Sequence, residues 1–304
     1  MESGGGTAPT PRIVGARHAL VLEASLVHAM TQRLVRTLNR KRALMYVLRR
    51  ALTPHGFLRV DVDPPGFTFR LSVQSGLARH LYKYGTYEPV IGNWMLDRFP
   101  RDSGGLFVDI GANFGWYSCL FSRFAGAAGR VIAFEPEPRN FRLLQDSLSR
   151  NECRNVTALQ EGVGADAGVM QLHLYKPSNP GRHSLLATSG GATVDVAIVS
   201  LDDRLAALGL AHEPIALMKI DVEGFEDSAL RGARGALARC RCLVMEYSPD
   251  LMRAAGVNPA ALIHLLAGTG LRPSLFEPGG AQPVALDVLR TLNRQVELLW
   301  ECGT

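Results

Sequence analysis

From residue 106 onward, short apolar runs alternate with amphipathic runs, and this alternation limits the fold more than any other feature. The runs LFVDI, RVIAFEP, VTALQEGVG, ALMKID and CLVMEYS have the nearly unbroken apolar character of strands that are buried on both faces. Between several of them lie helical sequences, namely WYSCLFSRFA, EPRNFRLLQDSLSRN and GFEDSALRGARGALARC. Strands and helices that alternate in this way predict an α/β fold with a parallel sheet covered by helices on both faces.

The segment before this alternation has a different character. Residues 1–10 (MESGGGTAPT) are expected to form a disordered tail, because Gly, Ser, Thr and Pro bury little surface. Residues 11–84 are expected to form an extension with a basic amphipathic helix and a small hairpin that is broken at a Pro-Pro-Gly sequence. Residues 85–304 then form the main domain. The helix is indicated by apolar residues four apart, Leu26, Met30, Leu34 and Leu38.

Charge is distributed unevenly along the chain. The net charge is +5, yet residues 11–50 hold nine Arg or Lys against one acid, Glu23, so the remainder is near neutral. A basic excess confined to one segment does not indicate a nucleic-acid enzyme, and we expect no nucleic-acid partner. We expect the leucine stripe to pack on the main domain, with the arginines in water. The alternatives are contact with an anionic membrane, contact with an acidic partner, or an organelle transit peptide.

Two features bear on the compartment of the protein. The five cysteines are odd in number, scattered and without C-x-x-C spacing, which is typical of small buried residues in a reducing compartment. No stretch approaches the ~18 apolar residues of a membrane span, and the polar N-terminus does not resemble a signal peptide. These features predict a cytoplasmic protein, whereas the sequence does not indicate an oligomeric state.

An aspartate followed by two glycines ends the first strand of the alternation. In FVDIGANFG, Asp109 stands near the carboxyl end, and Gly111 and Gly115 allow a sharp turn and a close approach of the next helix. Ligands of such sheets bind outside the carboxyl ends of the strands. Glu135 ends the next strand 26 residues later and can accept hydrogen bonds from both hydroxyls of a ribose. These residues predict a nucleoside-binding site.

The sequence of this loop narrows the choice of ligand. A dinucleotide-binding loop has the pattern G-x-G-x-x-G, but Asn113 and Trp116 stand at its second and third glycine positions, where side chains would meet a pyrophosphate. S-adenosylmethionine has an amino-acid moiety in place of the phosphates. Asp109 could face its amino group, and loop amides could meet its carboxylate. The pattern therefore favours S-adenosylmethionine, with a nucleotide-dependent oxidoreductase as the alternative.

Six segments resemble, in order and approximate spacing, the FkbM family of S-adenosylmethionine-dependent methyltransferases: GTYEPVIGNWM, LFVDIGANFGWYS, VIAFEPEPRNFRLLQDSL, VSLDD, MKIDVEGFEDSALRGA and VMEYS. The resemblance covers roughly residues 85 to 250. It implies a Rossmann-like class I methyltransferase fold with a mostly parallel seven-stranded sheet, and O-methylation of a sugar, glycoconjugate or natural product. By residue-to-residue match it also implies the cofactor-binding residues, which are Glu88, Asp109, Gly111, Asn113, Gly115 and Glu135.

Acidic residues at the end of the fourth strand are the main candidates for catalysis. Methyl transfer to a hydroxyl needs an acceptor placed in line with the methyl group and a base within reach of its proton. In KIDVEGFE, Asp221 is the first candidate and Glu223 the second; His183, in the loop GRHSLL, is a third. Each has a structural alternative, because Asp221 could cap a helix, Glu223 could complement its first turn, and His183 could be a surface residue.

The remaining motifs concern a metal, the acceptor and the adenine. Asp221 with Glu223 or Glu246 could hold Mg²⁺, which takes oxygen ligands, but the sequence alone does not establish a metal site. Glu246 and Tyr247 end the fifth strand and could line an acceptor pocket. In EGVGADAG, Gly162 and Val163 could pack against adenine, whereas Asp166 lies several residues further on. A binding module that has lost catalysis is a further alternative, which the intact site residues argue against.

Overall fold

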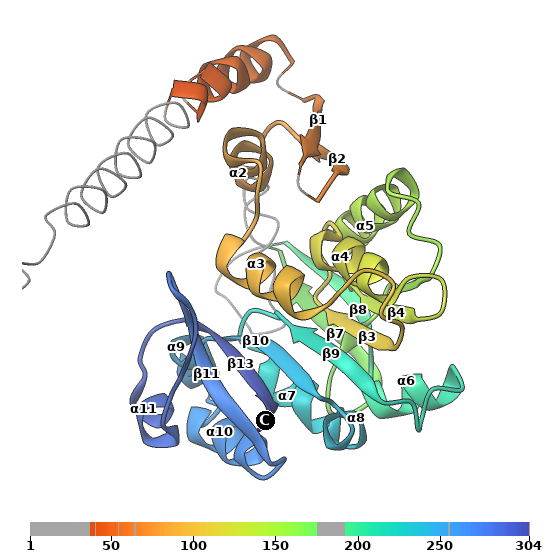
Figure 1. Ribbon diagram of the computed structural model, residues 1–304, viewed down its shortest axis with the longest axis vertical. Coiled ribbons are helices and arrows are strands. Elements are labelled where there is room, and N and C mark those ends of the chain that lie inside the picture. The colour runs from red at the N-terminus through yellow and green to blue at the C-terminus, as the bar shows by residue number, and fades with distance from the viewer. Residues whose placement is uncertain are drawn as a thin grey trace, which may run out of the picture.

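The computed structural model describes residues 37–39, 41–53, 55–63, 65–174, 192–254 and 256–303. An eight-stranded sheet with helices on both faces forms its centre (Figure 1). The strands are, in spatial order, β12 (Gly280–Pro283), β11 (Leu271–Glu277), β13 (Val296–Cys302), β10 (Cys242–Tyr247), β9 (Ile215–Ile220), β3 (Leu106–Ile110), β4 (Arg130–Phe134) and β5 (Val156–Leu159). The strands from β10 to β5 pair in parallel, whereas β13 is antiparallel to both β10 and β11. The prediction of a mostly parallel, Rossmann-like α/β sheet is confirmed.

The strands differ from the prediction in two details. The sheet has eight strands instead of seven, because the chain turns back after β11 and pairs with it as the edge strand β12; Gly280, with φ 105°, allows this turn. The run VTALQEGVG was predicted as one strand but forms two. Only β5 joins the main sheet, whereas β6 (Gly162–Val163) belongs to a small sheet with β8 (Thr193–Val199) and β7 (Gly168–His173).

The strand residues alternate between two hydrophobic cores, one on each face of the main sheet. Phe107 and Val131 face the core that contains α4 (Trp116–Ala125) and α5 (Pro138–Arg150). Their neighbours Val108 and Ile132 face the other core. The helices that contribute to that second core are α6 (Leu201–Ala207), α7 (Glu226–Arg231), α8 (Arg234–Ala238), α9 (Pro249–Ala254), α10 (Pro259–Ala267) and α11 (Leu286–Thr291).

A glycine divides what the sequence predicts as one helix, GFEDSALRGARGALARC, into α7 and α8. A Cβ atom at Gly232 would lie 2.0 Å from the carbonyl oxygen of Gly164, so only glycine permits this contact. Asp202 then accepts hydrogen bonds from the backbone amides of Gly235 and Ala236, both at 2.7 Å, and so caps α8. The break is therefore set by tertiary contacts that the helical periodicity does not reveal.

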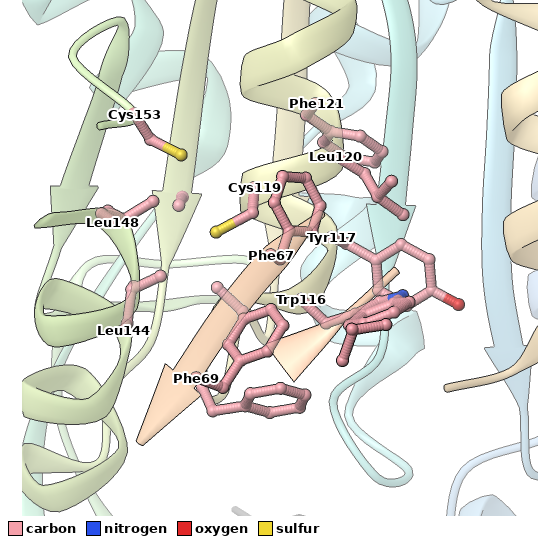
Figure 2. Packing of buried hydrophobic residues seen from close by; sticks show 14 of the residues in the cluster. Phe67, Phe69, Trp116, Tyr117, Cys119, Leu120, Phe121, Leu144, Leu148 and Cys153 are labelled. Atoms are coloured by element: carbon pink, nitrogen blue, oxygen red, sulfur yellow. The ribbon is translucent and has the colours of Figure 1, made fainter. Parts of the chain in front are cut away.

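The predicted hairpin is present and shares its core with the main domain. It consists of β1 (Phe57–Val62) and β2 (Phe67–Ser72), and α2 (Gly76–Tyr84) and α3 (Pro89–Arg98) connect it to the sheet. Figure 2 shows Phe67 and Phe69 of β2 among residues of α4 and α5. The Phe69 ring lies 5.7 Å from that of Trp116. The hairpin is thus part of the main hydrophobic core, and the boundary at residue 84 stays a prediction.

The N-terminal helix is described from residue 41 to residue 52, with residues 37–39 also helical. Residues 1–36, which include the predicted tail and three leucine-stripe positions, lie outside the described residues. Leu38 is the described member of that stripe, and it is 48% exposed, so the expected packing of the stripe on the main domain is wrong at this position.

The described residues include no helix that is long and apolar enough to cross a membrane. All five cysteines are free thiols. Cys119, Cys153, Cys240 and Cys242 are buried, as predicted, whereas Cys302 is exposed.

Candidate active site

The carboxyl ends of β3, β4 and β9 open onto one cavity of about 490 Å³. The residues that line the cavity fall into two groups, according to the strands that they lie near. Toward β5 the polar and small lining residues are Gly111, Asn113, Glu135, Asn140, Glu161, Gly162 and Val163. Toward β10 and β13 they are Tyr87, Glu88, Asp221, Glu223, Glu246, Gln295 and Glu297. Several of the predicted nucleoside-binding and catalytic residues thus meet in one cavity, in two adjoining halves.

The loop after β3 requires a glycine where it passes the end of β9. Gly111 has φ 84°, and a Cβ atom there would lie 1.9 Å from the carbonyl oxygen of Asp221. No side chain fits this contact without a shift of the backbone. At Gly111, the loop of the nucleoside half therefore packs directly against the strand end that carries Asp221.

Asn113 and Glu135 hold each other in the nucleoside half. The backbone amide of Asn113 donates a hydrogen bond to Glu135 Oε2 at 2.8 Å, and the backbone amide of Glu137 donates one to Oε1 at 2.9 Å. Each carboxylate oxygen still has a lone pair, so Glu135 can also accept from the hydroxyls of a ribose. Burial raises the pKa of Glu135 to about 7, although the two amide hydrogen bonds act in the opposite direction. The side chain of Asn113 adds a buried Oδ1 that has no hydrogen-bond partner among the described residues.

Three residues singled out in the sequence of this loop do not line the cavity. Asp109 is buried and accepts a hydrogen bond of 2.6 Å from Ser118, and burial raises its pKa to about 6. Gly115, with φ 92°, begins α4, where a Cβ atom would lie 2.8 Å from Leu144. The Trp116 ring packs against those of Phe67 and Phe69. Trp116 therefore cannot block a pyrophosphate. Of the two side chains expected to exclude a dinucleotide, only Asn113 lines the cavity.

The opposite wall of the nucleoside half comes from the segment after β5. Gly162, Val163 and Leu172 provide apolar contact surface, whereas Asp166 is not part of the lining. Arg204 of α6 forms an ion pair with Glu161 and neutralises that carboxylate. This wall is suited to packing against a flat base, as predicted for Gly162 and Val163.

The other half of the cavity contains five carboxyl groups and one buried cation. Glu88, Asp221, Glu223, Glu246 and Glu297 line it, and Lys219 supports it from the end of β9. Lys219 Nζ lies 2.8 Å from Asp221 Oδ2 and 4.6 Å from the centroid of the Tyr117 ring. Burial alone would lower the pKa of Lys219, but the charges of Asp221, Glu88 and Glu297 outweigh it and raise the pKa. The lysine therefore places a positive charge directly beside Asp221.

Glu88 and Glu223 both have strained backbone conformations at this half of the cavity. Their φ angles are 43° and 50°, in the left-handed region that glutamate rarely adopts. Glu88 precedes α3 and accepts a hydrogen bond from the Tyr117 hydroxyl of α4. Glu223 lies in the turn between β9 and α7. Strain of this kind is maintained by the surrounding structure and is concentrated at functional sites.

Three of the carboxyl groups have the spacing of a metal site. One oxygen from each of Asp221, Glu223 and Glu246 lies within 4.8 Å of the others. Burial, with the charges of Asp221 and Glu223, raises the pKa of Glu246 to about 10, and burial raises that of Glu297 to about 8. Protonation of Glu246 together with the charge of Lys219 relieves the repulsion among these groups. The same three carboxyl groups also offer oxygen ligands of the kind that Mg²⁺ takes.

Glu226, directly behind this cluster on α7, is the clearest case of a buried acid. Its Oε1 accepts a hydrogen bond of 2.9 Å from the Gly224 amide, and its Oε2 has no partner among the described residues. Burial raises its pKa from 4.5 to about 8. Between these two pH values the folded protein keeps a proton that the unfolded chain releases. The free energy of unfolding therefore falls as pH rises through this window.

We expect Glu226→Gln to remove this contribution to the pH dependence of stability. Near pH 5 the variant and the wild type should differ by less than about 1 kcal/mol, and at pH 9 the variant should be more stable by roughly 4 kcal/mol. Urea unfolding between these pH values measures the difference. The exposed Glu213→Gln variant is the control and should follow the wild type. Parallel curves for Glu226→Gln and wild type would contradict the raised pKa of Glu226.

Most, but not all, of the residues that line this half were predicted from the sequence. Asp221, Glu223 and Glu246 lie where predicted, whereas His183 lies outside the described residues. Gln295 and Glu297 were missed. They come from the start of β13, which pairs with the end of β10 so that Glu297 lies opposite Glu246. The sequence signal that could have revealed them is a glutamine and a glutamate at the amino end of a strand that pairs antiparallel with β10.

Strand order and cavity together define the class of protein. Without the added edge strand β12, the order β11-β13-β10-β9-β3-β4-β5, with the antiparallel β13 second from the end, is that of a class I methyltransferase, and the cavity lies at the carboxyl ends of the parallel strands. Residues 109–268, more than half of the chain, match the methyltransferase FkbM domain. The chain belongs to the FkbM family of S-adenosylmethionine-dependent methyltransferases.

Several characterised proteins are similar to this chain over about half of its length. The methyltransferase sdnD of Sordaria araneosa is 30% identical over 48% of this chain and 67% of its own length. The hexuronic acid methyltransferase AglP of Haloferax volcanii is 30% identical over 52% of this chain and 60% of its own length. Among solved structures, the methyltransferase FkbM of Methylobacillus flagellatus is 18% identical, with a TM-score of 0.41, and the match covers 73% of this chain and 54% of that one.

The residues of the nucleoside half fit S-adenosylmethionine. Glu135 offers acceptors for the ribose hydroxyls, and the unpartnered Oδ1 of Asn113 offers an acceptor for a further donor. Gly162, Val163 and Leu172 offer a surface for adenine. The carboxylates of the adjoining half favour the positive charge of a sulfonium. Among the described residues, the lining of the cavity offers carboxylate and amide oxygens and no lysine or arginine, which suits a cofactor that carries no phosphate.

We expect Glu135→Ala to weaken S-adenosylmethionine binding by about 1 to 3 kcal/mol, the cost of a lost hydrogen-bonding partner in a buried site. Because burial raises the pKa of Glu135 to about 7, wild-type affinity should also decline below that pH, as the acceptor becomes protonated. Isothermal titration calorimetry at pH 6 and pH 8.5 measures both effects. Glu213→Ala, which changes an exposed glutamate, is the control. Unchanged affinity in a folded Glu135→Ala variant would reject the ribose assignment.

Proposed function

We propose that the protein O-methylates a hydroxyl group of a sugar, glycoconjugate or natural product. The observation that carries this proposal is the Asp221 carboxylate, which lines the cavity next to the nucleoside half and is held by Lys219 at 2.8 Å. When bound, S-adenosylmethionine supplies an electrophilic methyl group. In the transfer the acceptor oxygen bonds to the methyl carbon, the sulfur–carbon bond breaks, and the sulfur keeps the electron pair.

Asp221 has the position and the chemistry of the group that orients the acceptor and takes its proton. Lys219 binds Oδ2 and fixes the plane of the carboxylate. That arrangement suits a hydroxyl whose proton is lost as the oxygen–carbon bond forms, because a strong base is then not needed. Positioning supplies the larger part of the rate, since the acceptor oxygen must lie in line with the methyl group.

The charge of the acceptor half favours an acceptor rich in hydroxyl groups and without negative charge. Carboxylates accept hydrogen bonds from sugar hydroxyls, and even with Glu246 and Glu297 protonated the remaining carboxyl groups outnumber Lys219, which disfavours an anion. AglP is named as a hexuronic acid methyltransferase. We therefore propose that the acceptor of this chain is a neutral polyol or glycoside.

Methyl transfer to a panel of acceptors tests the proposal. The protein is incubated with methyl-labelled S-adenosylmethionine and with neutral glycosides or matched hexuronides, and the products are analysed by mass spectrometry and NMR. We expect label in an O-methyl ether and a preference for the neutral members. Label on nitrogen or carbon would contradict O-methylation. Cofactor binding without transfer to any acceptor would favour a silent binding module, and binding of NAD instead would favour the oxidoreductase.

A further inference from the structure

The helix over residues 41–52 carries a broad apolar surface that no described part of the protein covers. Tyr46 is its one buried side chain among the described residues. The exposed apolar residues, between 46% and 81% accessible, are Leu38, Leu44, Met45, Val47, Leu48 and Leu52. Single exposed leucines are common on protein surfaces, but six large apolar side chains within fifteen residues are not. This surface therefore indicates a contact with something outside the described structure.

The contact between this helix and the rest of the protein uses a different side. Tyr46 donates hydrogen bonds to the carbonyl oxygens of Val73 and Ser75, the first at 2.5 Å, and its ring lies 6.1 Å from that of Tyr82. The Arg49 guanidinium lies 5.7 Å from the centroid of the same Tyr82 ring. These interactions fix the helix beside α2, at the edge of the molecule (Figure 1). The apolar surface is thus held in a fixed orientation, facing outward.

The spacing of the exposed residues forms one continuous arc. Leu38, Met45 and Leu52 are seven residues apart, and Leu44 and Leu48, four apart, continue the arc beside them. Lys41 falls inside this arc, where its long side chain can lie along the apolar surface and extend its charge outward. Arg50 is exposed beyond the border of the arc. The segment from 37 to 52 contains no Asp or Glu.

We propose that this helix docks the protein peripherally on anionic membranes, with its apolar arc in the interface and its basic residues among the lipid headgroups. A wide apolar face bordered by Lys and Arg is the pattern of helices that lie in a membrane interface. The charge distinguishes this partner from a second copy of the chain. Two copies packed through the arc would bring together two basic segments without one acid to pair with, whereas anionic headgroups complement them.

Flotation of the full-length protein with lipid vesicles tests this proposal, and the result does not depend on whether the protein methylates a hydroxyl. We expect binding to vesicles of phosphatidylcholine with phosphatidylglycerol, weaker binding to phosphatidylcholine alone, and a decline as salt is added. The double variant Leu44→Gln/Leu48→Gln should bind at least about ten-fold more weakly. Lys41→Gln/Arg50→Gln should bind the anionic vesicles about ten-fold more weakly and leave the weak binding to neutral vesicles unchanged.

The matched control is Val169→Gln, which removes a 72% exposed apolar side chain from β7 and should leave vesicle binding unchanged. Thermal melts verify that each variant is as stable as the wild type, as expected for exposed positions. No binding by the wild type at low salt would overturn the proposal, as would equal losses in the Val169→Gln control. A concentration-dependent dimer that the Leu44→Gln/Leu48→Gln variant abolishes, without any vesicle binding, would assign the arc to self-association instead.

Discussion

Replacing Asp221 with asparagine should lower the rate of methyl transfer by about 10²-fold or more, the lower range for a positioned general base. Asparagine has nearly the same shape, and its amide cannot take the proton of the acceptor hydroxyl. Cofactor affinity should change little, because the ribose acceptor Glu135 is in the other half of the cavity. Single-turnover rates with labelled cofactor measure the first effect, and calorimetry measures the second.

The pH–rate profile separates a role in proton transfer from a structural one. The pH dependence of the wild-type rate should differ in shape from that of the residual rate of Asp221→Asn, because the amide cannot take a proton from the acceptor. Asp287→Asn, at a residue whose side chain is 91% exposed, is the control and should keep the wild-type rate. A folded Asp221→Asn enzyme with wild-type turnover would remove Asp221 from the mechanism and direct attention to Glu223 and His183. Loss of wild-type activity with a chelator, restored by Mg²⁺, would instead identify a metal site.

Replacing Lys219 with methionine should reduce the free energy of unfolding by about 3 to 5 kcal/mol near neutral pH, the cost of removing one partner of a buried ion pair. The lysine is 2% exposed and pairs with Asp221, whose side chain is 22% exposed. Without it, the carboxylates of the acceptor half would face one another unscreened. Urea unfolding measures the loss, which should be smaller at low pH, where the carboxyl groups are protonated.

A double-mutant cycle that combines Lys219→Met with Asp221→Asn measures the interaction energy between these two side chains. The double variant Lys219→Met/Asp221→Asn should be more stable than Lys219→Met alone, because the amide needs no counter-charge. Equal instability of the two would show that the lysine stem, packed beside Tyr117, matters more than its charge.

The main sheet between residues 106 and 247 could be predicted from the sequence because its central strands are buried on both faces. Strands such as LFVDI and CLVMEY are buried at every residue and each contains a single acid, so their apolar pattern can be recognised without knowledge of the surroundings. The places where prediction differed depend on contacts between distant segments. Gly232 divides a helix because Gly164 lies against it, and Gly280 allows the extra edge strand β12.

The site could be predicted where it follows the rule that ligands bind at the carboxyl ends of parallel strands. This rule located Glu135, Asp221 and Glu246. It could not locate Glu297, which lies at the amino end of an antiparallel strand and reaches the cavity only through its register with β10. Nor does it give the direction of a side chain, as Asp109 illustrates by bonding to Ser118 behind the cavity wall.

The origin of Gln295 and Glu297 has a consequence for how such enzymes diversify. The FkbM domain match ends at residue 268, whereas both side chains come from the segment after it and still line the proposed acceptor half. The cofactor residues all lie before that limit. We therefore expect that a change in the segment from β11 to β13 alters acceptor preference while the cofactor residues stay in place. A chimera with a foreign β11–β13 segment is the natural starting point for redirecting the enzyme to new alcohols.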